Sequence, residues 1–107
     1  ATTGGINPNI KNLKHSNLVL FPAHPNPFNP KTTITYKTKK TNNINIKICN
    51  SNGTLIDSFI INNKPRGTHI FNWDAKNRSG GQLPSGIYFI IFDVENTIDI
   101  SKIVLIK

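Results

Sequence analysis

Three prolines within six residues, Pro25, Pro27 and Pro30, constrain this chain more than any other feature of its sequence. Each proline fixes its own φ and lacks a backbone N–H, so residues 25–30 can form neither a helix nor a central strand. The residue before each proline is also restricted to extended geometry. The segment carries one large apolar side chain, Phe28, and alternating threonine, isoleucine and tyrosine follow it. We predict a rigid lead-in to a strand that closes one end of a β-domain with Phe28, and we prefer this to an exposed ligand-binding spur.

The rest of the sequence predicts short β-strands and no helix. The clearest strand contains Ile44, Ile46 and Ile48, which alternate with other residues as on a half-buried strand. Residues 86–92 are apolar on both faces, which favours a position near the middle of a sheet. Turn-forming residues separate the apolar stretches. The expected strands span residues 18–21, 33–38, 44–49, 54–61, 68–73, 86–92 and 97–106.

This succession predicts an all-β fold, an immunoglobulin-like antiparallel β-sandwich of about seven strands with no significant helix. The disulfide framework of antibody domains is absent, because Cys49 is the single cysteine. Residues 1–17 have no sustained apolar period, so we interpret them as a linker from an upstream domain and 18–107 as the Ig-like domain. We expect Tyr88 to be mostly buried. The expected core residues are Phe28, Ile46, Ile48, Phe71, Trp73 and Phe89.

The chain is strongly basic, with 13 Lys and Arg residues against five Asp and Glu residues and a formal charge of +8. Such a balance favours anionic partners, among them nucleic acid, lipopolysaccharide and phospholipid surfaces. The basic residues are scattered and are not interleaved with aromatic side chains, so we do not expect nucleic-acid binding.

The sequence offers little for catalysis, and we expect no enzyme, no metal and no cofactor. The one conceivable pair of catalytic carboxylates, Asp57 and Asp74, would lie on different segments of a small domain. The stretch after Asp74 resembles a calcium loop in outline, but Lys76 and Arg78 occupy positions that need oxygen ligands. The three histidines lack metal-ligand spacing. Cys49 is interpreted as a free structural thiol whose role stays open.

Five motifs then occur in order along the chain and suggest a family. They are Pro-Asn-Pro-Phe-Asn-Pro-Lys-Thr-Thr-Ile-Thr-Tyr at 25–36, Ile-Lys-Ile-Cys-Asn with a following glycine at 46–53, Gly-Thr-His with Trp-Asp at 67–74, Ser-Gly-Ile-Tyr-Phe at 85–89 and Lys-Ile-Val-Leu-Ile-Lys at 102–107. Together they resemble the type A C-terminal sorting domain of the type IX secretion system. That domain is similar to the Ig-like domain of flagellar hook-capping proteins.

The resemblance implies a non-catalytic signal that directs a larger cargo protein, itself often a hydrolase, through the outer membrane to the cell surface. The implied partners are the outer-membrane translocon, a surface sortase, the upstream cargo domain and anionic lipopolysaccharide. The implied location is secreted or cell-surface, reached through the periplasm. The implied recognition residues are Pro25, Asn26, Pro27, Gly86, Tyr88, Lys102, Val104 and Lys107.

Two other functions stay open at this point. A structural Ig-like spacer would carry the same motifs around Trp73 and Gly86, and a carbohydrate- or protein-interaction module would need an exposed aromatic platform. For a sorting domain, the final strand, with Lys102 and Lys107 near its end, would offer an edge to which a receptor could add a strand.

Overall fold

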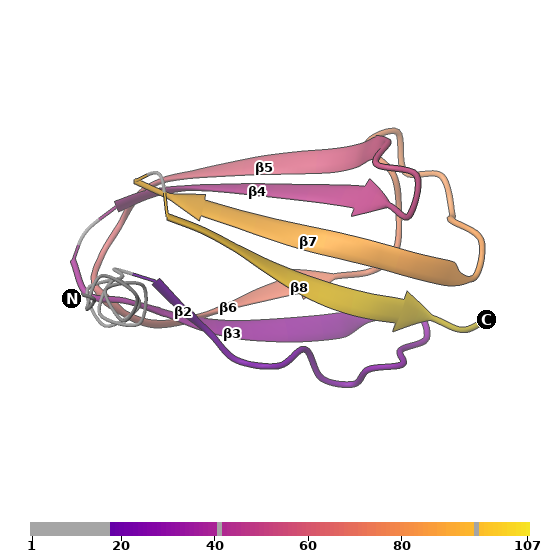
Figure 1. The fold of residues 1–107 in the computed structure, drawn as a ribbon, viewed down its shortest axis with the longest axis horizontal. Helices are drawn as coiled ribbons and strands as arrows, with labels where there is room; N and C mark the ends of the chain where they lie inside the picture. Colours follow the sequence, from indigo (N-terminus) through magenta and orange to yellow (C-terminus); the bar gives the residue numbers. More distant parts are fainter. Residues whose placement is uncertain (1–17, 41, 96) are drawn as a thin grey trace, which may run out of the picture.

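The chain folds into two antiparallel β-sheets that face each other (Figure 1), as the computed structural model shows for residues 18–40, 42–95 and 97–107. One sheet has the order β2-β3-β6 and the other the order β5-β4-β7-β8. The predicted all-β sandwich is therefore confirmed, whereas the predicted linker at 1–17 lies outside the described residues. The strands are β2 (Leu18–Leu20), β3 (Thr32–Thr38), β4 (Asn42–Asn50), β5 (Leu55–Lys64), β6 (Gly67–Trp73), β7 (Gly86–Val94) and β8 (Thr97–Leu105). The described part of the chain contains no helix that is long and apolar enough to span a membrane.

The core lies between the two sheets and follows the alternation of the strands. Ile44, Ile46 and Ile48 of β4 are all fully buried, as their spacing predicts. Beside them, Ile90 and Phe92 of β7 are also fully buried. The strand β7 is hydrogen-bonded to β4 on one side and β8 on the other, so its predicted central position is confirmed.

Two of the expected core aromatics depart from the prediction. Phe71 is only partly buried, although it packs against the core and its ring lies 6.1 Å from that of Phe92. Phe89 points to the outer face of its sheet, because Tyr88 and Ile90 on either side of it point inward. The prediction of Phe89 as a core residue was wrong because a strand that is apolar on both faces does not reveal which face is buried.

Asn50 to Gly53, residue types that are typical of turns, form the turn between β4 and β5. The N–H of Gly53 donates to the carbonyl of Asn50 at 2.9 Å, and φ of Gly53 is 84°, a left-handed value that favours glycine. The side-chain oxygen of Asn50 accepts hydrogen bonds from the N–H groups of Asn52 and Thr54. These bonds fix the register of the β4–β5 hairpin.

Tyr36 and Tyr88 provide a matched test of buried hydroxyl groups. Both rings are buried, but the Tyr88 hydroxyl donates to the Pro84 carbonyl at 2.7 Å, whereas the Tyr36 hydroxyl has no partner among the described residues. We expect Tyr36→Phe to leave the free energy of unfolding unchanged or raise it by up to about 1 kcal/mol, because it removes an unsatisfied polar group. We expect Tyr88→Phe to lower it by about 1 kcal/mol. Urea denaturation of the two variants measures both effects.

The stability at alkaline pH offers a second measurement on the Tyr36→Phe variant. Burial raises the pKa of Tyr36 above 10.0, so the folded chain keeps this proton at a pH where the unfolded chain loses it. Stability contributed by Tyr36 is therefore complete below pH 10 and is lost as the pH rises beyond it. Tyr36→Phe should weaken this alkaline loss; an equal loss in wild type and variant would show that the phenol does not titrate as its burial requires.

Candidate functional site

The Pro-rich segment lies along the outer edge of β8 and forms hydrogen bonds with it. The N–H of Phe28 donates to the Val104 carbonyl at 2.9 Å, and the N–H of Ile106 donates to the Phe28 carbonyl at 3.0 Å. The Pro-rich segment and β8 run parallel here, and Phe28 forms a parallel β-bridge with Leu105. The first and the last of the five motifs, which only the family resemblance had connected, are therefore in contact in the structure.

The side chain of Asn26 supplies two further hydrogen bonds to the same edge. Its Nδ2 donates to the Lys102 carbonyl at 3.0 Å, and its Oδ1 accepts from the Val104 N–H at 3.0 Å. The flanking Pro25 and Pro27 have no N–H to donate, so their backbone cannot form this part of a ladder. The asparagine side chain, which donates one of these bonds and accepts the other, replaces the missing peptide groups. We call these two bonds the Asn26 clamp.

Phe28 anchors the Pro-rich segment in the core. Its side chain is only 2% exposed, and its ring centre lies 6.0 Å from that of Trp73. The Trp73 ring in turn lies 5.7 Å from that of Tyr88. The prediction that Phe28 closes one end of the domain is confirmed.

The Asn26 clamp changes the expectation for strand addition. The predicted edge at the C-terminal end of β8 is already covered at Lys102, Val104 and Ile106, so a receptor strand cannot pair there while the segment is in place. Earlier in β8, the Ile100 N–H donates to the carboxylate of Asp99 at 2.9 Å. A charge on an edge strand discourages pairing with a further strand. The expectation of an open terminal edge was therefore wrong, because the sequence did not reveal what covers it.

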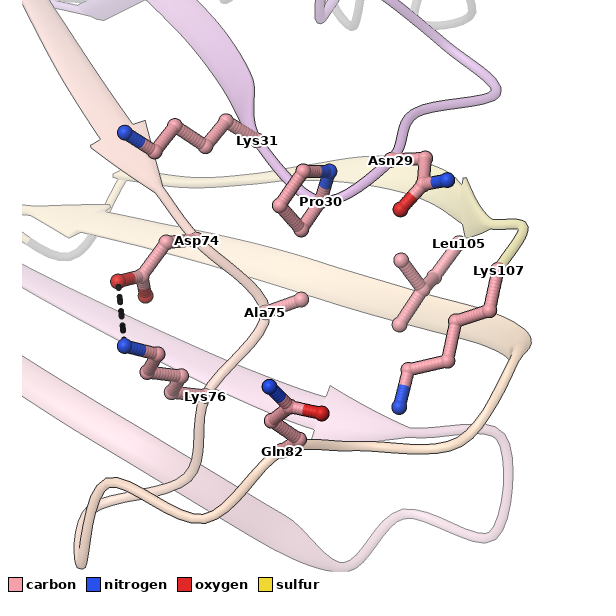
Figure 2. A pocket seen from close by; sticks show the side chains of 9 residues that line it. All are labelled: Asn29, Pro30, Lys31, Asp74, Ala75, Lys76, Gln82, Leu105 and Lys107. Carbon is pink, nitrogen blue, oxygen red and sulfur yellow. Dashed lines mark ion pairs between the residues drawn. The ribbon is translucent and has the colours of Figure 1, made fainter.

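A hollow opens where the Pro-rich segment, the C-terminus and the loop after β6 meet (Figure 2). Its volume is about 470 Å³. Three lysines from three segments, Lys31, Lys76 and Lys107, line it together with a single carboxylate, Asp74. The Lys76 ammonium lies 3.8 Å from the Asp74 carboxylate. The remaining lining residues are Asn29, Pro30, Ala75, Gln82 and Leu105.

The hollow has the character of a site for an anion. Its positive charge exceeds its negative charge, and the amides of Asn29 and Gln82 can donate hydrogen bonds. Figure 2 shows the Lys107 side chain extending beside Leu105 toward the middle of the hollow, while that of Lys31 points away from it. The Lys107 backbone N–H donates to the Ser85 hydroxyl at 3.0 Å, which fixes where the side chain begins.

The structure brings most of the predicted recognition residues to one end of the domain. Asn26, Lys102 and Val104 meet in the Asn26 clamp, and Gly86 pairs with Leu105 across β7 and β8. Tyr88 differs from the others because its side chain is buried and burial raises its pKa, so it acts as a structural hydrogen-bond donor. Sequence reasoning missed Lys31, Lys76, Asn29 and Gln82 as lining residues. The signal that could have found two of them is the first motif, in which Asn29 and Lys31 flank Pro30.

Other candidates for chemistry stand apart from this site. Trp73 is buried, so it offers no exposed platform for a sugar ring. The His69 ring nitrogen lies 2.6 Å from the Pro65 carbonyl, in keeping with its place on a strand beside a loop. No three His, Cys, Asp or Glu side chains of the described chain gather as a metal site would require. Cys49 is a partly exposed free thiol.

Two facing antiparallel sheets without a helix in the described chain define an immunoglobulin-like β-sandwich. The model of the FlgD Ig-like domain matches residues 27–97, well over half of the sequence. The chain therefore belongs to the FlgD Ig-like domain family. No curated protein matches the sequence.

Several solved structures of bacterial proteins have the same fold. Dimeric latent PorU from Porphyromonas gingivalis aligns with a TM-score of 0.64 at 16% identity, over 85% of this chain and 10% of that one. PorZ, an essential surface component of the type IX secretion system of the same bacterium, aligns with a TM-score of 0.56 at 18% identity, over 84% and 11%. FlgD from Xanthomonas campestris, which acts in hook capping, aligns with a TM-score of 0.57 at 21% identity, over 89% and 72%. The chain thus spans about a tenth of PorU and of PorZ, and at these identities the likeness shows the fold alone.

Proposed function

We propose that this chain is a non-catalytic sorting domain of the type IX secretion system, which directs a larger cargo protein through the outer membrane to the cell surface. One observation carries the proposal: the Asn26 clamp joins motif residues that stand 76 and 78 positions apart in the sequence. Motifs that serve one signal are expected to lie close together, and the contact between the first and the last motif supports this. The fold shared with PorU and PorZ is compatible with this function.

The surface that a receptor would contact is the hollow beside the Asn26 clamp. Lys107 extends toward its middle, and the apolar side chain of Leu105 forms part of its wall. Lys31 also belongs to the lining, although its side chain points away from the middle. A carboxylate or phosphate group would balance the excess positive charge. The proposed partners are the outer-membrane translocon, a surface sortase, an upstream cargo domain and anionic lipopolysaccharide. The proposed location is the cell surface, reached through the periplasm.

A structural Ig-like spacer is the second candidate, and the match to the FlgD Ig-like domain favours it. A spacer needs the same buried Trp73 and the same β7, but it has no need of a charged hollow beside the C-terminus. The two functions differ in whether the domain can export an unrelated protein.

The export experiment fuses residues 18–107 to the C-terminus of a periplasmic reporter in a bacterium that has the type IX system. Deleting 102–107 is a poor test, because it removes Ile103 and Leu105, which are buried, and would unfold the domain. Lys31→Glu with Lys107→Glu instead reverses charge on exposed side chains. We expect the wild-type fusion to be displayed at the surface. For the double variant we expect display at least about tenfold lower, which corresponds to a loss of about 1.4 kcal/mol in binding free energy.

The control variant is Lys37→Glu with Arg66→Glu, which makes the same charge change at exposed positions away from the hollow. It should display the reporter as wild type does. Both variants should keep the melting temperature of the wild-type domain. A wild-type fusion that stays in the periplasm would instead support the spacer function.

A further inference from the structure

The outer face of the four-stranded sheet carries an apolar band that crosses all four strands. The strand register places Leu55 beside Cys49, Cys49 beside Phe89, and Ile91 beside Ile100. Ile87 and Val104 continue the band along β7 and β8, and Ile98 extends it at the other end. Ile98 is 61% exposed, Ile100 55% and Leu55 48%. We call this surface the apolar band.

A shallow hollow of about 430 Å³ lies within the apolar band. Cys49, Phe89, Ile91 and Ile100 form its apolar lining, and Asn50, Ser51 and Gly53 of the β4–β5 turn complete it. Side chains from three neighbouring strands, β4, β7 and β8, thus create a continuous apolar surface, and contiguous exposed apolar patches mark interaction sites. The outer face of the three-stranded sheet differs, since Ile70 lies there beside Thr35, and Val19 beside Lys37.

Cationic side chains adjoin the apolar band. Lys47 lies beside Ile91 across β4 and β7, and Lys102 lies beside Phe89 across β7 and β8. The register places one carboxylate on the same face, Asp93, which lies in the next row between Asn45 and Ile98. The two lysines outnumber this carboxylate, so the face best suits an occupant that is both apolar and anionic.

The charges and the residue types decide between possible occupants. A second copy of this chain would bring the same two lysines to the interface from each side, and the formal charge of +8 adds repulsion. Protein interfaces are enriched in tyrosine, tryptophan and arginine and depleted in lysine, whereas this face combines lysine with isoleucine. Lysine stems can instead lie along apolar side chains while their ammonium groups reach lipid headgroups.

We propose that the apolar band docks on the surface of an anionic phospholipid bilayer, with Ile98, Ile100 and Leu55 inserted among the headgroups and Lys47 and Lys102 bound to lipid phosphates. Membrane affinity of such a surface combines buried apolar area with attraction to anionic lipid. The proposal does not depend on a role in export, because it concerns a face distinct from the charged hollow beside Lys107.

The experiment measures co-sedimentation of the 107-residue chain with vesicles of phosphatidylcholine containing phosphatidylglycerol, and with vesicles of phosphatidylcholine alone. We expect binding to the mixed vesicles and much weaker binding to the neutral ones. Ile98→Asn with Ile100→Asn should lower the partition coefficient at least about tenfold, since it removes apolar area from the contact. Lys47→Gln with Lys102→Gln should lower it by a similar factor at low salt and less at high salt, where charges are screened.

Two control variants distinguish binding through this face from binding through the basic charge of the whole chain. Ile70→Asn with Val19→Asn replaces two exposed apolar side chains on the other sheet, and Lys37→Gln with Arg66→Gln removes two charges elsewhere. Both should bind as wild type does. Three results would overturn the proposal: no binding to the mixed vesicles, an equal loss in the control variants, or a concentration-dependent dimer that Ile98→Asn with Ile100→Asn abolishes.

Discussion

Replacing Phe28 with alanine is expected to lower the free energy of unfolding by about 3–5 kcal/mol, the usual cost of truncating a buried phenylalanine. The side chain is almost fully buried and contacts the Trp73 ring, so its removal leaves a cavity under the Pro-rich segment. The hydrogen bonds between the Phe28 backbone and those of Val104 and Ile106 depend on that anchor. Urea denaturation followed by Trp73 fluorescence measures the loss.

Phe21→Ala is the matched control for this change. Phe21 is 41% exposed, and its N–H donates to the Thr35 carbonyl, a bond that alanine keeps. We expect it to cost less than about 1 kcal/mol, because little apolar area returns to water. Phe28→Leu should cost less than the alanine variant because it refills part of the cavity. Equal losses for Phe21→Ala and Phe28→Ala would show that Phe28 does not anchor the segment.

Local patterns were sufficient to predict the architecture. Alternation fixed the inward face of β4, because Ile44, Ile46 and Ile48 share one side of a strand with a period of two. Asn50 specified a turn through its side-chain hydrogen bonds and Gly53 through its left-handed φ. These signals act within a few residues, so they can be recognised without knowing the fold.

The features that the sequence did not disclose depend on partners far away in the chain. The place of Phe89 depends on which face of β7 meets the other sheet, and both faces are apolar. The hollow depends on the loop at Asp74 and Lys76 approaching Lys107, which no local pattern specifies. Proline spacing predicted a rigid segment but could not reveal that Asn26 would bind β8.

The covered edge of β8 also limits how the C-terminus can be recognised. Backbone groups of Lys102, Val104 and Ile106 already have partners, so a receptor that binds the folded domain contacts side chains and the hollow instead of the strand edge. A receptor that pairs with the strand would first have to displace the Pro-rich segment, with Phe28 leaving the core. The stability of the Asn26 clamp therefore decides between these two modes of recognition.

Asn26→Ala is expected to lower the free energy of unfolding by about 1–3 kcal/mol, because it removes two hydrogen bonds, each worth roughly 0.5–1.5 kcal/mol. The two lost partners are the Lys102 carbonyl and the Val104 N–H. Amide exchange gives the sharper measurement, since the Val104 N–H would lose its Asn26 acceptor and should exchange faster. The Ile106 N–H, held by the Phe28 carbonyl, should be affected less.

Asn29→Ala is the control within the same segment. Its side chain is exposed and lines the hollow without forming part of the Asn26 clamp, so stability and Val104 exchange should stay close to wild type. If Asn26→Ala left Val104 exchange unchanged while Asn29→Ala accelerated it, the clamp would not be what covers this edge. If Asn26→Ala accelerates exchange at Val104 alone and the domain remains folded, the segment opens locally, and a strand-pairing receptor then has a route to β8.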